Sequence, residues 1–313
     1  MNTALHDVPP PDLLQAERSD PSPDWIEVAA HAPAVNAQLL HARAASVRLP
    51  GGRCIGPFDL SLQAGERIAI LGPSGAGKST LLKLLAGDWP AFAGAVLFDG
   101  RALREHTAAA LAKRRAVLPQ SHAVAFGMPV SLVVSLGRIA RQVDPTLDAS
   151  VGQALQAAQA LHLGARRFDT LSGGEQARVM LARVFAQLWD VERGLLLVDE
   201  PLAALDPALQ LELTAALVGF CAARGHALVA ILHDINQALG AFERLWLVRD
   251  GRLVGDLPTS RAAVPALAAL FGIGLQCVDT EDGSLAVLAR RAEQTQSAER
   301  ADSADSAEAP CAA

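Results

Sequence analysis

The chain has 313 residues, of which 51% are hydrophobic and 19% are charged, and its net charge is −6. This is the composition of a globular protein, and a mildly acidic chain is not expected to bind nucleic acid. No apolar run reaches the roughly 20 residues of a membrane-spanning helix, and residues 1–7 lack the basic start of a signal peptide, so we expect a cytoplasmic protein. The 4 cysteines lack the paired spacing of a zinc site and are interpreted as free thiols.

Both ends of the chain have the composition of disordered segments. Residues 1–38 hold many prolines among polar residues, and residues 291–313 are mostly Ala, Ser, Glu and Asp without periodicity. The folded domain is therefore expected over residues 39–290.

Within this domain, short apolar runs alternate with helical patterns. Residues 67–71 predict a buried strand, followed by a helix over 79–86 that ends at Gly87. Further strands are predicted at 95–98, 195–198 and 228–232, and a hairpin at 245–255 around Asp250-Gly251. This alternation favours an α/β fold with a largely parallel sheet, and the absence of an internal repeat indicates a single unit.

The segment after the first predicted strand matches a phosphate-binding loop. The motif and the start of the helix comprise Gly72, Pro73, Ser74, Gly75, Ala76, Gly77, Lys78, Ser79 and Thr80. The glycines let backbone N–H groups close around phosphates, and the helix N-terminus adds a partial positive charge. In this pattern Lys78 reaches the β- and γ-phosphates, and the Ser79 hydroxyl binds Mg²⁺. A plain glycine-rich turn is the alternative, but the strand before it and the helix after it favour a nucleotide site.

Two carboxylates follow the strand predicted at 195–198. Asp199 is placed to hold Mg²⁺, and Glu200 is placed to orient or deprotonate an attacking water. A strand that merely ends in polar surface residues would look the same in isolation. The phosphate-binding loop upstream favours the catalytic interpretation.

Residues 171–175 read Leu-Ser-Gly-Gly-Glu ahead of a helical pattern. Ser172, Gly173 and Gly174 combine small side chains with the free N–H groups of a helix N-terminus, which suits an anion. The alternative is a glycine-rich helix cap with Ser172 as the capping residue. After a phosphate-binding loop, this segment resembles the signature motif of the ABC ATPase family, which usually has Gln where this chain has Glu175. The resemblance implies that the motif meets the ATP held by a second subunit.

Three single residues extend the resemblance by their order and spacing. Gln120 matches the Q-loop residue that senses Mg²⁺ and the γ-phosphate, Asp206 matches the D-loop that crosses the dimer, and His233 matches the switch histidine that contacts the γ-phosphate. Taken singly, such residues are more often structural, so these assignments depend on the motifs around them. The implied catalytic residues are Glu200, His233, Gln120 and Lys78, and the implied Mg²⁺ ligands are Ser79, Gln120 and Asp199.

The resemblance covers residues 39–278 and implies a fold class. Members of the family have an α/β P-loop NTPase core of the RecA type, an N-terminal antiparallel β part and an inserted helical subdomain, here at about 121–171. The chain departs from the family at residues 46–49, which read Ser-Val-Arg-Leu, because members often have an aromatic there that stacks on adenine. The chain has no tyrosine. We expect the side chain of Arg48 or Leu49 to pack against the adenine ring instead.

Three stretches, at 114–120, 181–189 and 232–238, resemble the ATPases of bacterial hemin importers, in the group that also moves iron–siderophores and vitamin B12. The resemblance implies an ATP- and Mg²⁺-dependent homodimer, peripheral on the cytoplasmic face of the inner membrane. Its implied partners are two transmembrane permease subunits and, through the complex, a periplasmic solute-binding protein. Residues 121–137 are apolar and would help to form the groove for a coupling helix of the permease; the alternative is that their apolar side chains belong to an ordinary helix core.

Three other functions are compatible with parts of this sequence. An iron–siderophore or vitamin B12 importer would use the same motor. A soluble ABC ATPase of translation or DNA repair usually has two cassettes or a long coiled-coil insertion, and neither is visible in this sequence. A nucleotide-binding module without catalysis would lack the base or the lysine, whereas Glu200 and Lys78 are both present.

Overall fold

The computed structural model describes residues 38–120, 127–200, 205–280, 283 and 285–290. The expectation of disorder at 1–37 and 291–313 falls outside the described residues. Gln38, which the sequence analysis assigned to the leader, begins the first strand.

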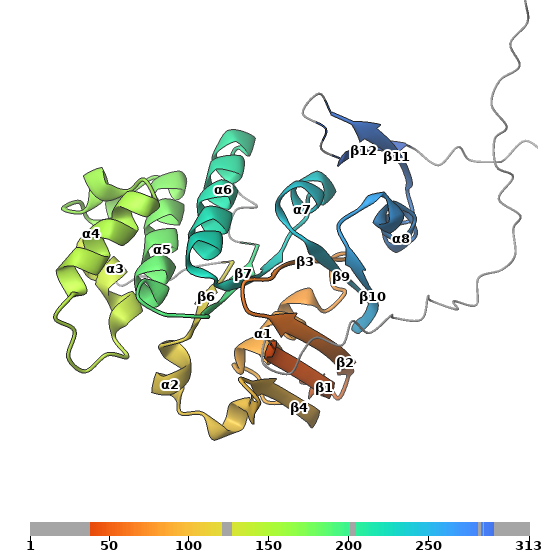
Figure 1. Ribbon diagram of the computed structural model, residues 1–313, viewed down its shortest axis with the longest axis horizontal. Helices are drawn as coiled ribbons and strands as arrows, with labels where there is room; N and C mark the ends of the chain where they lie inside the picture. Colours follow the sequence, from red (N-terminus) through yellow and green to blue (C-terminus); the bar gives the residue numbers. More distant parts are fainter. Residues whose placement is uncertain (1–37, 121–126, 201–204, 281–282, 284, 291–313) are drawn as a thin grey trace, which may run out of the picture.

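A six-stranded sheet forms the centre of the fold (Figure 1). Its strands, in spatial order, are β10 (Arg252–Pro258), β9 (Arg244–Arg249), β3 (Arg67–Leu71), β8 (Ala227–Ile231), β7 (Leu195–Asp199) and β6 (Arg115–Leu118). All neighbouring pairs are parallel except β10 with β9. The carboxyl ends of the parallel strands therefore meet at one edge, which is where ligands bind in open α/β sheets.

A four-stranded antiparallel sheet lies beside the central sheet. Its strands, in spatial order, are β2 (Cys54–Gln63), β1 (Gln38–Arg48), β4 (Ala93–Phe98) and β5 (Arg101–Ala102). Together with α1 (Lys78–Ala86) it covers one face of the central sheet, where Ile68 and Ile70 join its core. The intervening Ala69 and Leu71 belong to the core on the other face, because successive side chains of a strand point to opposite sides.

Helices contribute to the core on that second face. They are α3 (Val130–Ser135), α4 (Leu147–Ala157), α5 (Gly173–Leu188), α6 (Pro207–Arg224), α7 (Ile235–Ala241) and α8 (Val264–Phe271). Figure 1 shows α3, α4 and α5 gathered at one end of the molecule. The C-terminal hairpin of β11 (Gly274–Asp279) and β12 (Leu285–Arg290) lies toward the opposite end, against α7.

The remaining elements are short. They are α2 (Ala108–Ala112) and five 3₁₀ turns, η1 (Leu103–Glu105), η2 (Leu136–Arg138), η3 (Leu161–Leu163), η4 (Phe168–Thr170) and η5 (Arg261–Ala263). Between residues 127 and 171 the regular elements are helical.

The predicted elements agree with these bounds. The strand at 67–71 is β3, the helix at 79–86 is α1 with one residue more at its start, and the hairpin is β9–β10. The α/β fold class with a parallel-rich sheet and an antiparallel N-terminal part is confirmed. The hairpin β11–β12 was not predicted. In the part of the chain that the structure describes, no helix has both the length and the apolarity to cross a membrane.

Candidate active site

A cleft of about 350 Å³ opens at the carboxyl edge of the central sheet, between β3 and the start of α1. Its lining comprises Ser74, Gly75, Ala76, Gly77, Lys78, Ser79, Thr80, Glu200 and His233. Gly75 and Gly77 have φ angles of 77° and 102°, which side chains with a Cβ rarely adopt. A Cβ on Gly72 would stand 2.1 Å from the carbonyl oxygen of Val248, so the start of the loop has room for glycine alone.

Lys78 is nearly buried at the bottom of this cleft, with 5% of its surface exposed. Its ammonium group donates to the carbonyl oxygens of Gly72 (2.9 Å) and Pro73 (3.1 Å) and lies 3.8 Å from the carboxylate of Glu200. Burial lowers the pKa of Lys78, while Glu200 acts in the opposite direction. The cation is thus held by backbone oxygens within the loop, where a phosphate would meet it.

Ser79 and Asp199 converge beside the lysine although they lie on α1 and β7. The Ser79 hydroxyl donates to Oδ1 of Asp199 over 2.9 Å, and Asp199 is 8% exposed. Burial raises the pKa of Asp199, and the Ser79 hydroxyl counteracts this rise. In the described residues no cluster of three or more His, Cys, Asp or Glu side chains could hold a metal. A hydroxyl with one carboxylate still fits Mg²⁺, which takes few protein ligands together with substrate phosphates.

Glu200 and His233 follow the adjacent parallel strands β7 and β8 and meet across the cleft. The Nε2 atom of His233 lies 2.6 Å from Oε2 of Glu200. The Glu200 side chain is 13% exposed and that of His233 is 51% exposed. The carboxylate therefore stands between the buried ammonium of Lys78 and a histidine at the mouth of the cleft.

Gln120 and Asp206 lie outside the cleft lining. Gln120 is exposed beyond the end of β6, the strand that pairs with β7, and so stands at the same edge of the sheet. Asp206 is the N-cap of α6, and its side chain accepts a hydrogen bond from the Leu209 amide over 3.0 Å.

Ser172, Gly173 and Gly174 lie at the N-terminus of α5, also outside the cleft. Ser172 caps the helix: its hydroxyl accepts from the Glu175 amide, while the Glu175 carboxylate accepts from the Ser172 amide. A Cβ on Gly174 would stand 2.5 Å from a methyl of Leu209 on α6. The signature segment and the first turn of α6 are therefore packed against each other. The structure brings the sequence-predicted residues together in two places, the cleft and this helix end, and leaves Gln120 apart from both.

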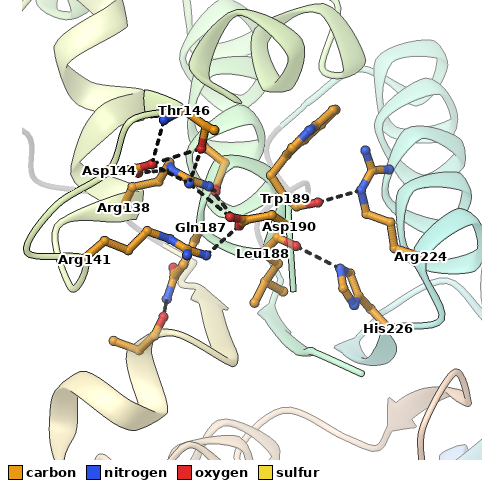
Figure 2. A network of polar contacts seen from close by, with 12 residues as sticks. Arg138, Arg141, Asp144, Thr146, Gln187, Leu188, Trp189, Asp190, Arg224 and His226 are labelled. Atoms are coloured by element: carbon orange, nitrogen blue, oxygen red, sulfur yellow. Dashed lines mark hydrogen bonds and ion pairs between the residues drawn. The ribbon is translucent and has the colours of Figure 1, made fainter. Parts of the chain in front are cut away.

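The other end of α5 is fixed by side chains from elsewhere in the fold, as Figure 2 shows. Three side chains donate hydrogen bonds to backbone carbonyls at this end. Arg138 binds the Ala186 carbonyl (3.0 Å), His226 binds the Leu188 carbonyl (3.1 Å) and Arg224 binds the Trp189 carbonyl (3.2 Å). The sequence analysis did not find these three residues.

Arg138 is buried at 3% exposure. It donates two hydrogen bonds to Asp144, of 2.5 and 2.9 Å, and its Nη1 atom reaches Asp190 over 3.1 Å (Figure 2). Its hydrogen bond to Asp144 holds the pKa of that carboxyl at about 2. Arg138 thereby ties α5 to the segment between η2 and α4.

His226 is fully buried between α6 and β8. Its Nδ1 accepts from the Gly194 amide over 3.0 Å and its Nε2 faces the Leu188 carbonyl. An N–H pointing at Nδ1 and a carbonyl facing Nε2 require the neutral tautomer with hydrogen on Nε2. Burial lowers the pKa of His226. This histidine joins the end of α5 to the residue that precedes β7.

An aromatic side chain lies beside one of the two residues considered for covering adenine. The guanidinium of Arg48 lies 3.7 Å from the ring centroid of Phe92, and Phe92 is 52% exposed. The Phe92 amide donates to the Ser46 carbonyl, so the contact follows from the pairing of β4 with β1. Phe92 was not predicted, because it lies outside residues 46–49 and reaches Arg48 only through the pairing of the two strands.

A family model described as ABC transporter matches residues 55–203. The chain is 43% identical over 239 residues to the hemin import ATP-binding protein HmuV of Pseudomonas aeruginosa, covering 75% of this chain and 93% of that protein. It is 40% identical over 261 residues to HmuV of Rhodopseudomonas palustris, covering 81% and 96%.

Solved structures share the fold at lower identity. A metal-chelate type ABC transporter in an inward-facing conformation matches with a TM-score of 0.67 and 24% identity, over 82% of this chain and 99% of that chain. A dimeric ATP-binding cassette in a post-hydrolysis state, bound to ADP and Pi, matches with a TM-score of 0.63 and 22% identity, over 71% and 99%.

Proposed function

This chain belongs to the family of ABC transporter ATP-binding proteins, and on that premise we propose that its ATP hydrolysis drives the import of hemin. The observation that carries the substrate is the identity of 43% and 40% with two hemin import ATP-binding proteins along 93% and 96% of their lengths. Import of an iron–siderophore or of vitamin B12 is the second candidate, because a metal-chelate type transporter shares the fold.

The proposed complex contains two copies of this chain at the cytoplasmic face of the inner membrane. Two transmembrane permease subunits and a periplasmic solute-binding protein complete it. The ABC domain spans residues 39–290 in this proposal, with the helical subdomain at about 121–171. Residues 127–137, the described part of the expected permease groove, include α3, whose Leu132 is 46% exposed.

In the proposed reaction, Lys78 and the backbone N–H groups of the loop from Ser74 to Thr80 bind the phosphates of ATP. Ser79 and Asp199 would hold Mg²⁺, with Gln120 as a further ligand once the subdomains close. When bound there, Mg²⁺ would supply positive charge against the phosphate oxygens. The contact of 2.9 Å between Ser79 and Asp199 places both oxygen donors at one point beside the lysine.

Glu200 is the proposed general base for the attacking water. Its two carboxylate oxygens contact different residues: Oε1 lies 3.8 Å from the Lys78 ammonium and Oε2 lies 2.6 Å from Nε2 of His233. One oxygen can hold the water while the side chain stays oriented by the other. His233 would contact the γ-phosphate from the mouth of the cleft, on the side opposite Lys78.

The signature segment would act on the nucleotide of the second copy. Ser172, Gly173 and Gly174 offer a helix N-terminus outside the lining of the chain's own cleft, and Asp206 begins the helix that packs against it. Two copies arranged head to tail would place each signature opposite the partner's phosphate-binding loop. Binding of ATP then closes the pair, and hydrolysis reopens it.

The test of the substrate is purification of the complex after mild detergent solubilisation, with the bound small molecule identified by absorbance and mass. A permease complex whose solute-binding partner carries haem supports hemin import. A partner that carries a siderophore or a corrinoid retains the motor and overturns the substrate.

The test of the motor uses Glu200→Gln. We expect the variant to bind ATP and remain in a closed dimer, because the phosphates are held while the base is lost. Normal turnover by Glu200→Gln would refute the assigned base. Cell fractionation that recovers only a soluble protein without a permease would favour a non-transport ABC ATPase.

A further inference from the structure

The signature serine has a negatively charged neighbour on its own helix. Oε2 of Glu175 accepts hydrogen bonds from both the Ser172 amide (2.8 Å) and the Ser172 hydroxyl (3.0 Å). The Ser172 amide lowers the pKa of Glu175 most, and Arg166 adds to this effect, so the carboxylate is ionised at neutral pH. A full negative charge thus lies beside the atoms that would bind the partner's phosphate.

Arg166 is bound to the other oxygen of the same carboxylate. Its Nη1 donates to Oε1 of Glu175 over 2.7 Å, and its Nη2 lies 3.4 Å from the Thr170 carbonyl. The Arg166 backbone is fixed as well, because its amide donates to Leu163 and its carbonyl accepts from Val130 of α3. The guanidinium therefore reaches Glu175 from a held position in the helical part of the fold.

Like charges repel strongly over short distances, and the repulsion grows as water leaves the space between them. When two copies close around ATP, an uncompensated Glu175 would face the γ-phosphate at the point where the interface becomes dry. With Arg166 paired to Oε1, the net charge of the pair is zero, and Oε2 continues to orient Ser172. A glutamine at this position would need no such partner.

We propose that Arg166 is a positioning residue for the trans-acting signature: it offsets the charge of Glu175 and so lets Ser172 accept the phosphate of the partner's ATP. This inference rests on the proposed function, in which the signature serves the second copy. In this proposal Arg166 does not contact the nucleotide and acts only through Glu175. Its effect is limited to closure of the dimer, because the chain's own phosphate-binding loop lies in a separate cleft.

The experiment separates binding within one chain from closure between two chains. In the full-length Glu200→Gln protein, binding of a fluorescent ATP analogue to the dilute monomer reports the P-loop cleft. Light scattering against ATP concentration reports the closed dimer. Each is measured for Arg166→Met, Glu175→Gln and the double variant. Arg167→Met is the matched control, because it removes the same charge from the adjacent residue, which pairs with Asp169.

We expect Arg166→Met to raise the ATP concentration for half-maximal dimer formation about tenfold, because the charge of Glu175 is then uncompensated at the closing interface. Analogue binding to the monomer should stay within about twofold of the parent, since its cleft is untouched. Glu175→Gln should lower the required ATP concentration, because it leaves the Arg166 cation facing the phosphate, and the double variant, which again has no net charge at the pair, should return to the value of the parent. Added salt should shrink the defect of Arg166→Met, because the charges are partly exposed.

A double variant as defective as Arg166→Met would overturn the inference, because the defect would then not depend on the charge of Glu175. An equal defect in Arg167→Met would overturn it too, since any surface charge would suffice. If Arg166→Met fails to fold, Glu175→Gln alone still decides, and unchanged or weaker closure in that variant refutes the proposal. If the Glu200→Gln parent forms no ATP-dependent dimer, alone or with permease, then the proposed function itself fails.

Discussion

The two ends of α5 differ in what their backbone groups bind. At the N-terminus the described chain supplies no acceptor for the amides of Gly173 and Gly174, and the Ser172 cap involves only Glu175. At the C-terminus, carbonyls accept from three long side chains that come from other elements (Figure 2). Every helix leaves backbone groups unpaired at both ends, so the contrast comes from the residues placed around them.

This difference teaches how one helix can be both firmly held and open to a ligand. The C-terminal contacts fix the axis of α5 relative to η2, α6 and β7. The small residues of the first turn keep the N-terminal amides accessible. We therefore expect changes at the C-terminal end to alter stability, and changes at the N-terminal end to alter closure with little effect on stability.

The largest loss of stability is expected for Arg138→Met. The substitution leaves Asp144 without its buried partner, which typically costs about 3–5 kcal/mol. It also removes the side-chain donor to the Ala186 carbonyl, which keeps only the Trp189 amide. Urea denaturation measures the free energy of unfolding. Arg141→Met is the control, because Arg141 contacts Asp190 from the rim and should cost less than about 1 kcal/mol. Equal losses in the two variants would show that Arg138 does not hold this end.

The next largest effect is expected for His226→Leu. It leaves the Gly194 amide without a partner and removes one of the donors to the Leu188 carbonyl, which keeps the Val191 amide, at a cost of about 1–3 kcal/mol. The surface change His162→Asn should leave the free energy of unfolding unchanged within about 0.5 kcal/mol. A similar loss in both variants would refute the bridging role of His226.

His226 also predicts a pH dependence. Burial lowers its pKa in the folded state below the ordinary 6.5, so the unfolded chain binds the proton more readily. The stabilisation is present above pH 6.5 and is lost as pH falls from 6.5 toward the lowered pKa of the folded state. Urea midpoints of the wild type and of His226→Gln across pH 5 to 8 test this. Parallel pH profiles of the two proteins would contradict it.

The smallest loss of stability is expected for Ser172→Ala, at about 1 kcal/mol for a helix cap. Its effect on function should be larger. Loss of a hydrogen bond to a charged phosphate is worth ~1.5–3 kcal/mol, or roughly a tenfold to hundredfold weaker ATP-dependent closure. Denaturation and light scattering on the same preparation compare the two effects. A variant that loses stability and closure in proportion would erase the distinction between the two helix ends.

The contiguous motifs were accessible to sequence analysis because their chemistry lies within a few neighbouring residues. The phosphate-binding loop, the Asp199–Glu200 pair and the signature each follow a strand or begin a helix, as expected. Buried strands such as β3 were predicted within a residue of their ends, because apolar runs bounded by turn residues define them. Adjacent parallel strands then brought Glu200 and His233 together.

Contacts between distant segments were not accessible in the same way. Arg138 lies 48 residues from Ala186, and His226 lies 38 residues from Leu188. An arginine or histidine in an apolar stretch does not indicate which carbonyl it binds. Phe92 beside Arg48 depends on the register of β4 against β1. The capping box at Ser172 could be predicted, because Ser172 and Glu175 are three residues apart at the start of a helix. The pairing of Glu175 with Arg166 depends instead on how η4 and its flanking residues turn the chain between them.

Glu200 adopts a left-handed backbone conformation with a φ of 46°. A residue with a Cβ is destabilised there by about 1–2 kcal/mol, a penalty that glycine largely avoids. A library of this protein selected only for heat resistance would therefore enrich glycine at position 200 and discard the base. Directed evolution toward higher thermal stability therefore needs an activity screen as well, because glycine at position 200 would raise stability while glutamate is needed for ATP turnover.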